Sequence, residues 1–548
     1  MRRPIHSPLP LRAALLATAL VCAAIAAALT LAPVQEPASG ADRAQAAPRP
    51  NIVEIVTDDQ TVRDLEVMSR TKSMIADEGV TFANSFVNFS MCCPSRATIL
   101  SGQYAHNHGV MGIYPPTGGY GKFDSNNSLA LWLQRGGYHT GHIGKMLNGY
   151  GSDSPANIPQ GWNEWYASVD PSTYRMYGYT LNENGVFNTY GDPNEENPAV
   201  YQTDVYTDKA VDYVNRNAPA PSPFYLSLNY LAPHHEEAPV REQTSTIVRP
   251  APRHANTLSG TALPTGPAFD EPDLSDKPPH VARRSAAPFS PDQIQEIARN
   301  YQRRQESLLA VDEGIERVVN TLRANGELAN TYIIFTSDNG YLQGQHRIPS
   351  GKLAPYEPSI RVPLLIRGPG IPRGRTSKEM VVNADLAPTI VDVTGARPLK
   401  VQDGRSLQRF WKRPRLKTTR PIMLQSGGVN RGSEEQDAGP VATLRPLQTY
   451  KGIRTERYLY VAYRSTTKEM YDLARDPHQL DSVIDDPRYR EARRELRNQL
   501  TALKTCRGRS CRLQRDEVPG PGPRVDSLLG IDPVPFAPAP APAPARRR

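Results

Sequence analysis

Residues 92–98 read Cys92-Cys93-Pro94-Ser95-Arg96-Ala97-Thr98, and Ser101-Gly102 follows shortly after them. Two adjacent cysteines before a proline are compatible with small buried residues at the start of a helix, or with half of a zinc site. A zinc site needs a second close cysteine pair with histidine nearby. The next pair, Cys506 and Cys511, lies at the other end of the chain, so zinc binding by this stretch is disfavoured.

Apolar runs of strand length alternate with helical patterns on both sides of this stretch. We expect strands at 51–57, 224–230, 331–336 and 362–366 and one ending near Gly144, with helices at 128–134 and about 294–322. This alternation predicts an α/β fold with a doubly wound, mostly parallel sheet. After Gly395, short strands at 421–425, 450–454, 458–463 and 469–473 and a helix at 488–503 predict a smaller subdomain with an antiparallel sheet.

Composition divides the chain further. Residues 1–49 contain early arginines, an apolar run at 13–32 and a small-residue stretch, which is typical of a signal peptide or membrane anchor followed by a linker. Either reading places the rest of the chain outside the cytoplasm. We expect a catalytic domain over 50–396, a C-terminal subdomain over 397–512 and a disordered Pro/Ala-rich tail over 513–548. Residues 236–291 contain few apolar residues. We therefore expect them to form a long surface insertion near the substrate-binding pocket of the catalytic domain.

Charge and cysteine usage limit the classes of partner. The formal net charge is +8, which favours binding of polyanions such as sulfated sugars or nucleic acid. The sequence contains no recognisable nucleic-acid-binding module, so no nucleic-acid partner is expected.

The cysteines can be read in the same way. In an exported chain Cys506 and Cys511 can close a short disulfide loop. The adjacent Cys92 and Cys93 could bridge each other only with severe strain, so a chemistry that consumes one of them fits the count.

Acidic and amide side chains stand at two predicted strand ends. Asp58-Asp59 ends the first strand, and Ser337-Asp338-Asn339-Gly340 ends a late one. Either motif alone is an ordinary turn signal. In open α/β sheets, however, ligands collect beyond the carboxyl ends of the strands, and oxygen ligands suit a hard divalent cation.

Together these segments resemble the type I sulfatases, whose signature is Cys-x-Pro-Ser-Arg. The resemblance implies an alkaline-phosphatase-like three-layer sandwich. It implies that a formylglycine-generating enzyme oxidises Cys92 to the aldehyde formylglycine, whose hydrate attacks the sulfur of a sulfate ester. It also implies one calcium ion with ligands from Asp58, Asp59, residue 92, Asp338 and Asn339.

The resemblance extends to further polar residues. Lys145, in Gly144-Lys145-Met146, and Lys352, in Gly351-Lys352-Leu353, are implied to contact the sulfate group, Lys352 also near the leaving oxygen. Arg96 is implied to hold the formylglycine oxygen. His234 is implied to protonate the departing alcohol, with His235 as its rival if the register slips.

One difference from the lysosomal arylsulfatases indicates which sulfatases this chain resembles most. Lysosomal arylsulfatases carry Lys-x-His, where this chain has Leu147 and then Asn148. The Lys-x-Leu-Asn form resembles N-acetylglucosamine-6-sulfatases and the extracellular heparan endosulfatases. His106 and His108 could supply the missing base or could be packed or contact substrate, and we favour the second reading because a base must first reach its proton.

We therefore expect a secreted or surface-tethered sulfuric ester hydrolase that acts on a sulfated sugar, such as 6-sulfated glucosamine, or on an aryl sulfate. One alternative is a phosphomonoester or phosphodiester hydrolase of the same superfold, which a second metal site would indicate. Another is a non-catalytic sulfated-glycan binder with an unconverted Cys92. The sequence leaves the oligomeric state open.

Overall fold

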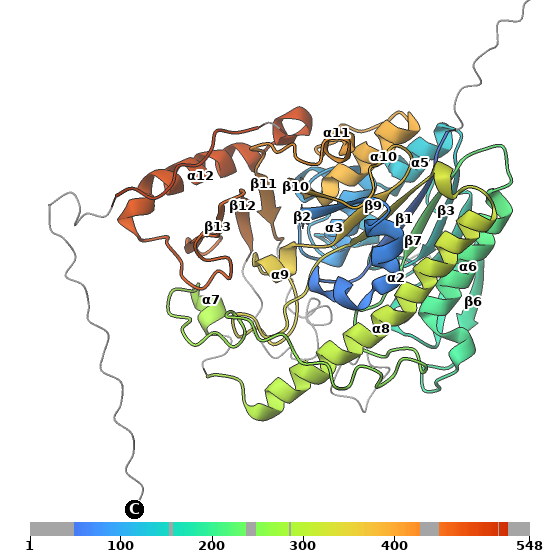
Figure 1. Ribbon diagram of the computed structural model, residues 1–548, viewed down its shortest axis with the longest axis horizontal. Coiled ribbons are helices and arrows are strands. Elements are labelled where there is room, and N and C mark those ends of the chain that lie inside the picture. Colours follow the sequence, from blue (N-terminus) through green and yellow to red (C-terminus); the bar gives the residue numbers. More distant parts are fainter. Residues whose placement is uncertain are drawn as a thin grey trace, which may run out of the picture. The chain divides into compact units, whose positions relative to one another are not determined.

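The central sheet of the computed structural model has the strand order β10-β2-β9-β8-β1-β7-β3-β4-β5-β6 (Figure 1). The structure describes residues 49–152, 157–236, 248–283, 287–427, 449–512 and 514–523. The strands are β1 Asn51–Thr57, β2 Val80–Phe86, β3 His139–Gly144, β4 Glu164–Ser168, β5 Tyr179–Glu183, β6 Val186–Tyr190, β7 Phe224–Asn229, β8 Thr331–Ser337, β9 Leu364–Arg367 and β10 Arg375–Val382.

The middle of this sheet is parallel. Strands β8, β1, β7, β3 and β4 run the same way, and β10 pairs in parallel with β2, whereas β9, β5 and β6 pair antiparallel with their neighbours. The prediction of a mostly parallel sheet is confirmed. The carboxyl ends of the central strands therefore meet at one edge.

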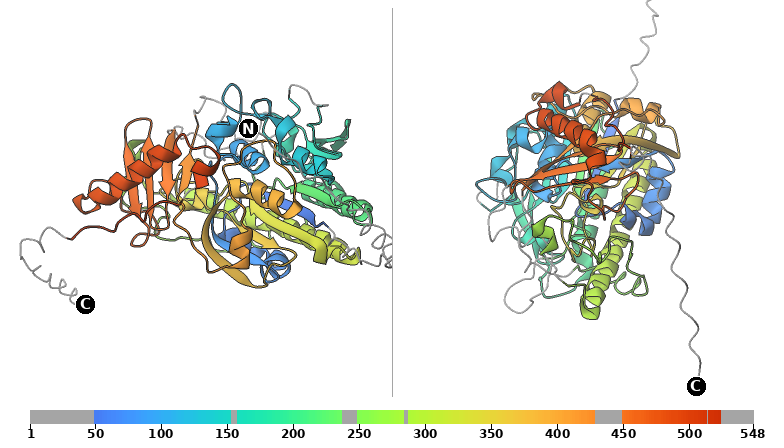
Figure 2. Two further views of the ribbon diagram at one scale, coloured as in Figure 1. Left: turned by 90° about the horizontal axis from the view of Figure 1, so that it is seen from above. Right: turned by 90° about the vertical axis from the view of Figure 1, so that its left-hand side faces the viewer.

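Helices cover both faces of the sheet (Figures 1 and 2). On β1, Ile52 and Val56 belong to a core with helices α3, α5 and α10, whereas Val53 and Ile55 belong to a core with α6 and α8. Side chains alternate between the faces of a strand, so one apolar run serves both layers. The helices are α2 Ser69–Thr71, α3 Cys92–Ser101, α4 Ala105–His108, α5 Leu129–Arg135, α6 Gln202–Asn217, α7 Pro279–Ala282, α8 Pro291–Ala324, α9 Glu357–Ile360, α10 Leu386–Thr394, α11 Gln408–Lys412 and α12 Arg490–Leu503.

A second sheet has the order β11-β12-β13-β14, with every pair antiparallel as predicted. Helix α12 lies against this sheet (Figure 2). It packs there through Leu496, Leu500 and Leu503, and a disulfide joins Cys506 to Cys511. The strands are β11 Ile422–Gln425, β12 Tyr450–Arg454, β13 Tyr458–Tyr463 and β14 Lys468–Asp472.

Two segments pack more closely than their composition suggested. In the insertion expected to be a surface loop, Val248, Leu274 and Val281 are buried. In the tail expected to be disordered from residue 513, Tyr458 donates a hydrogen bond to the Pro519 carbonyl at 2.9 Å. Apolar side chains that are sparse in sequence can still anchor a loop when each meets a hydrophobic neighbour.

The N-terminal apolar run and residues 524–548 lie outside the described residues. Within the part of the chain that the structure describes, no helix has both the length and the apolar character to cross a membrane.

Candidate active site

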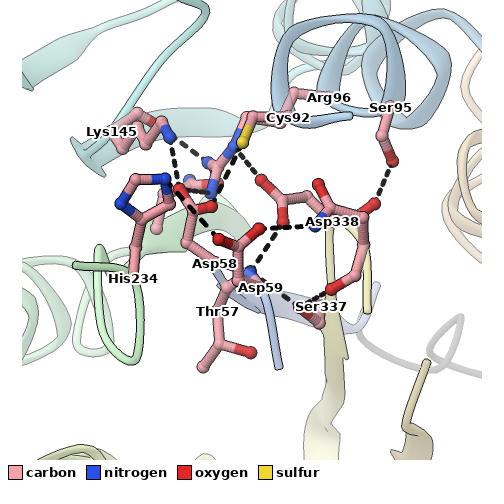
Figure 3. A network of polar contacts seen from close by, with 12 residues as sticks. Thr57, Asp58, Asp59, Cys92, Ser95, Arg96, Lys145, His234, Ser337 and Asp338 are labelled. Carbon is pink, nitrogen blue, oxygen red and sulfur yellow. Dashed lines mark hydrogen bonds and ion pairs between the residues drawn. The ribbon is translucent and has the colours of Figure 1, made fainter. Parts of the chain in front are cut away.

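Four neighbouring parallel strands, β8, β1, β7 and β3, deliver polar residues to one edge of the sheet. Thr57 lies opposite Ser337 in the β1–β8 register, so Asp58 and Asp338 leave their strands side by side. Lys145 follows β3, and His234 follows β7 after a short loop. Figure 3 shows these side chains pointing toward one another.

The turn after β3 requires a glycine. Gly144 has a φ of +98°, and a Cβ there would lie 2.0 Å from the carbonyl oxygen of Asn229. Only glycine tolerates both conditions, which explains why it directly precedes Lys145.

Cys92 begins helix α3, where the helix dipole favours negative charge. Its Sγ donates to Asp58 Oδ1 at 3.3 Å and accepts from Lys352 Nζ at 2.8 Å. Arg96, one helical turn later, lies on the same face. Its Nε donates to Asp338 Oδ2 at 2.7 Å, and its Nη2 lies 3.3 Å from Asp58 Oδ2.

The carboxylates form an oxygen-rich cage that is fully buried. Asn339 donates to Asp59 Oδ1 at 2.5 Å, and the backbone N–H of Asp59 donates to Asp338 Oδ1 at 3.2 Å. Potential ligand atoms of Asp58, Asp59, Cys92 and His234 lie within 4.8 Å of one another.

Two oxygens of this cage lack a hydrogen-bond donor among the described residues, namely Asp59 Oδ2 and Asn339 Oδ1. Buried oxygens without a partner are costly, and a hard cation would satisfy both. The residues present therefore fit a divalent ion such as calcium.

The pKa values of the two aspartates in the cage also fit a bound cation. Burial and the neighbouring Asp58 raise the pKa of Asp338 to about 6, although Arg96, Lys145 and Lys352 oppose this shift. Burial also tends to raise the pKa of Asp58, but Lys145 and the other cations hold it below its usual range. A divalent ion would favour the charged form of both carboxylates.

The remaining predicted residues line this cage. Lys145 Nζ lies 2.5 Å from Asp58 Oδ2, and Lys352 Nζ lies 2.7 Å from Asp59 Oδ1. His234 Nε2 lies 3.6 Å from Asp59 Oδ2, while its Nδ1 lies 2.7 Å from the carbonyl oxygen of His235. Of the two adjacent histidines, His234 is thus placed against a carboxylate of the cage.

Known proteins resemble this chain along most of its length. A family model for sulfatases matches residues 50–396. The chain belongs to the sulfatase family. A second model, described as the N-sulphoglucosamine sulphohydrolase C-terminal region, matches residues 443–506 of this sulfatase.

Relatives of this sulfatase span most of its length. It is 32% identical to the N-acetylglucosamine-6-sulfatase of Capra hircus, over 88% of each chain. It is 34% identical to the extracellular sulfatase SULF-1 homolog of Drosophila melanogaster, over 66% of this chain and 31% of the relative. A solved structure in complex with its substrate D-glucosamine-2-N,6-O-disulfate matches with a TM-score of 0.65 at 24% identity, covering 83% of this chain and 97% of that one. The fold of this sulfatase is thus alkaline-phosphatase-like, as expected.

Sequence reasoning missed two residues beside the cage. The Tyr174 ring lies 4.4 Å from Lys145 Nζ and 5.1 Å from the His234 ring, and Asn148 donates to the Tyr174 hydroxyl at 2.5 Å. Arg304 of α8 donates to the Asp59 carbonyl at 2.5 Å. Both come from segments far along the chain, and no local motif marks them.

The histidines near the signature contact the rest of the fold. His106 lies 2.9 Å from the Cys506 carbonyl, and His108 lies 3.0 Å from the Thr98 hydroxyl. Leu147, which replaces the histidine of the Lys-x-His form, is buried in the α3 core. These positions agree with packing rather than catalysis for both histidines.

Proposed function

We propose that this sulfatase cleaves sulfate esters with a hydrated formylglycine formed from Cys92 and with one calcium ion. The observation that carries the proposal is the position of Cys92 at a helix N-terminus, directly beside Asp58 and Lys352. When present, the hydrated aldehyde supplies the attacking oxygen, and calcium held by Asp58, Asp59, Asp338 and Asn339 lowers the pKa of that oxygen.

The chain's own cations would handle the charge of the substrate. A sulfate ester is anionic, and Lys145 and Lys352 already bind the two carboxylates nearest to residue 92. Arg96 neutralises Asp58 and Asp338 and fixes the first turn of α3. Preorganised cations of this kind stabilise charge that develops in the transition state.

His234 is the proposed acid for the leaving alcohol. Its Nδ1 is held by a backbone carbonyl, so its Nε2 is directed to the cage and can carry the proton. Because residue 147 is a leucine, we do not assign the base of the second step to that position.

For the substrate, we propose a 6-sulfated glucosamine unit, with aryl sulfates as the competing class. The named specificities of the relatives support the sugar. The phosphoester alternative is less well supported. In the described residues, the other close group of possible metal ligands is His106 with Cys506 and Cys511, and the disulfide between the two cysteines removes them as ligands.

The proposed site of action is outside the cytoplasm, and the formylglycine-generating enzyme is the proposed partner during maturation. The Cys506–Cys511 disulfide, the apolar N-terminal run and the extracellular designation of one relative support this location.

The decisive experiment is mass analysis of the peptide that contains residue 92, together with turnover of an aryl sulfate and an aryl phosphate. We expect the aldehyde, and a clear preference for sulfate over phosphate. If the Cys92 thiol is intact and the protein binds sulfated glycans without turnover, the protein is a non-catalytic glycan-binding protein instead. Preferred hydrolysis of the phosphate would favour the phosphoesterase.

A further inference from the structure

The charges of helix α12 are segregated around its axis. The helix packs on the second sheet through one buried face, and its remaining positions are exposed or half-buried (Figures 1 and 2). Lys504 directly follows the helix and keeps helical backbone angles. At about 100° per residue, Glu491 and Glu495 lie on one flank of the buried face. On the other flank, four cations fall within a sector of roughly 60° at the same spacing, namely Arg490, Arg493, Arg497 and Lys504.

Strands β12 and β13 border the flank that carries these cations. Burial raises the pKa of Tyr460, on β13, and the nearby Arg497 and Arg493 oppose this shift. Burial and the neighbouring Lys504 lower the pKa of Lys451, on β12. Lys451 therefore extends the row of cations from the helix to the sheet. We call the row the cationic stripe, which consists of Arg490, Arg493, Arg497, Lys504 and Lys451.

The acids of α12 and of the C-terminal segment are engaged away from this stripe. Glu491 pairs with Arg494 at 3.1 Å, and Glu495 accepts from Gln499 at 2.9 Å. Gln499 also donates to the Asp516 carbonyl at 3.1 Å. At the helical spacing, Gln499 lies on the side of the two glutamates, so the C-terminal segment follows the flank opposite the stripe.

The cationic stripe keeps most of its charge. Among the described residues, no carboxylate oxygen lies within 4.0 Å of a charged nitrogen of Arg490, Arg497, Lys504 or Lys451. Arg493 donates to the Ile484 carbonyl, which leaves its charge in place, and Asp485 adds one carboxylate near this end. Like charges that are held close together repel one another, and an anion bound along them removes that cost.

The shape of the cationic stripe favours an extended partner. At 1.5 Å per residue, the row from Arg490 to Lys504 spans about 21 Å. A linear polyanion can contact the whole row, whereas a small anion contacts one or two of its members. None of the proposed calcium ligands comes from α12 or from the second sheet.

We propose that the cationic stripe binds a sulfated polysaccharide, outside the catalytic centre. The chain belongs to the sulfatase family, and a polysaccharide with many sulfate esters is a linear polyanion. In this proposal, which rests on the proposed function, the stripe holds one part of the polymer while another part presents a sulfate ester to residue 92. The substrate class is then polymeric.

Binding of labelled dextran sulfate to the full-length protein, measured by fluorescence anisotropy, tests the stripe. The variant Arg490→Gln/Arg497→Gln/Lys504→Gln removes three charges from the surface and leaves the contact between Arg493 and Ile484 intact. We expect its Kd to rise at least about tenfold at about 0.1 M salt. The dependence of Kd on salt should become shallower, because fewer counterions are released. Uncharged dextran should not bind wild type.

A second triple variant separates the stripe from net charge. Arg375→Gln/Lys378→Gln/Arg415→Gln removes three exposed cations from β10 and from the segment after α11. It should bind dextran sulfate within about twofold of wild type, and both variants should keep the wild-type Tm and aryl sulfate turnover. Equal losses in the two variants, or no loss in the stripe variant, would overturn the proposal. Tighter binding of duplex DNA than of dextran sulfate would also overturn it, in favour of nucleic acid.

Kinetics connect the stripe to turnover. For heparin, a polymer that contains 6-sulfated glucosamine, the stripe variant should raise KM at unchanged kcat, by about the factor that dextran sulfate binding loses. KM for a 6-sulfated monosaccharide should stay the same. An unchanged KM for heparin would overturn the role in substrate binding. If wild type binds dextran sulfate through the stripe but turns over no sulfate ester, the proposed function fails and the binding surface stands.

Discussion

The Cys92 thiol is fully buried between an acceptor and a cation, Asp58 Oδ1 at 3.3 Å and Lys352 Nζ at 2.8 Å. Its neighbour Cys93 belongs to the apolar core beneath α3 instead. Cys92 thus lies in the polar site, whereas Cys93 lies in the apolar core. The same substitution at each position separates loss of chemistry from loss of packing.

Replacing Cys92 by alanine should abolish turnover. Alanine has no thiol that could be oxidised to formylglycine, so the attacking oxygen is missing. We expect a loss of about 10³-fold or more, the scale of removing a nucleophile, with little change in Tm. Cys93→Ala should keep most of the activity and lower the stability by about 1 kcal/mol through lost packing. Aryl sulfate assays and thermal melts check both. Full activity in Cys92→Ala would refute the aldehyde mechanism.

Asp338→Asn should lose calcium and activity together. The change keeps the size of the side chain but removes a charge that Arg96 pairs with and that the cation needs. We expect at least about a hundredfold loss of kcat/KM, and metal analysis of the purified variant should show less bound calcium. Asp516→Asn, at an exposed position in the C-terminal segment, is the control. Retention of calcium in Asp338→Asn would mean that the cage is wrongly assigned.

Tyr174 should act as a positioning residue through its ring. Tyr174→Leu removes the face that lies under Lys145, and we expect kcat/KM to fall about tenfold, mainly in KM if Lys145 contacts the sulfate. Tyr174→Phe keeps the ring and loses only the bond from Asn148, so it should stay within about threefold of wild type. Equal losses in both variants would point to the hydroxyl instead.

At this scale the sequence predicts residues that stand in local motifs and misses those that arrive by packing. Asp58, Cys92 and Asp338 are readable because a short segment carries each of them with its turn or helix start. Tyr174 and Arg304 are not, because their partners lie 26 or more residues away in the chain and depend on how α8 and the loop before β5 pack.

Among the elements, the central strands are predictable and the outer ones are not. Strand β1 is buried at every position because helices cover both of its faces, and its two Ile-Val pairs make it recognisable as a strand. Strand β10 begins Arg375-Thr376, with both residues exposed, and β6 is exposed along most of its length. Edge and rim strands bury one face or none, so their sequences resemble loops.

The insertion before α8 depends on a buried cation. The Lys277 side chain is fully buried and lies 2.9 Å from Glu271 and 3.0 Å from Asp276, and it donates to the Leu480 carbonyl of the C-terminal subdomain. Few apolar side chains mark this segment in sequence, and the polar network supplies much of its attachment.

Lys277→Met should therefore destabilise the protein by about 3–5 kcal/mol, because Glu271 would be left buried with one partner fewer. Denaturant unfolding measures the change. Lys412→Met, on the exposed side of α11, should change stability by less than about 0.5 kcal/mol. A Lys277 variant as stable as the Lys412 variant would show that the network contributes nothing net.

In the molecule as a whole, the C-terminal subdomain is attached to the catalytic helix layer by buried polar contacts. Asn88 donates to the Met423 carbonyl at 2.7 Å, and Gln425 donates to Asn88 Oδ1 at 2.8 Å. Asp403 accepts from the N–H groups of Tyr104 at 2.8 Å and Gly508 at 2.6 Å. Unfolding of either part should therefore expose polar groups of the other, which favours a single cooperative transition.

The pH dependence of that transition should reflect Glu54, in the middle of β1. Its side chain is 1% exposed and accepts from the Tyr225 hydroxyl at 2.6 Å. Burial raises its pKa from 4.5 to about 7, although the Tyr225 bond opposes the shift. Between these two pH values the unfolded chain releases the proton while the folded chain keeps it, so stability falls as pH rises through this window.

Glu54→Gln removes this titration and keeps an acceptor for Tyr225. Below pH 4.5 both proteins should respond to pH in parallel, because the carboxyl is protonated in both states. From there to about pH 7 the variant should gain on wild type by about 1.4 kcal/mol per pH unit, or about 3 kcal/mol in total, and then run parallel again. Denaturant unfolding at fixed calcium across pH 4 to 8 measures the difference. Curves that stay parallel over the whole range would show that Glu54 is ionised in the folded protein at ordinary pH.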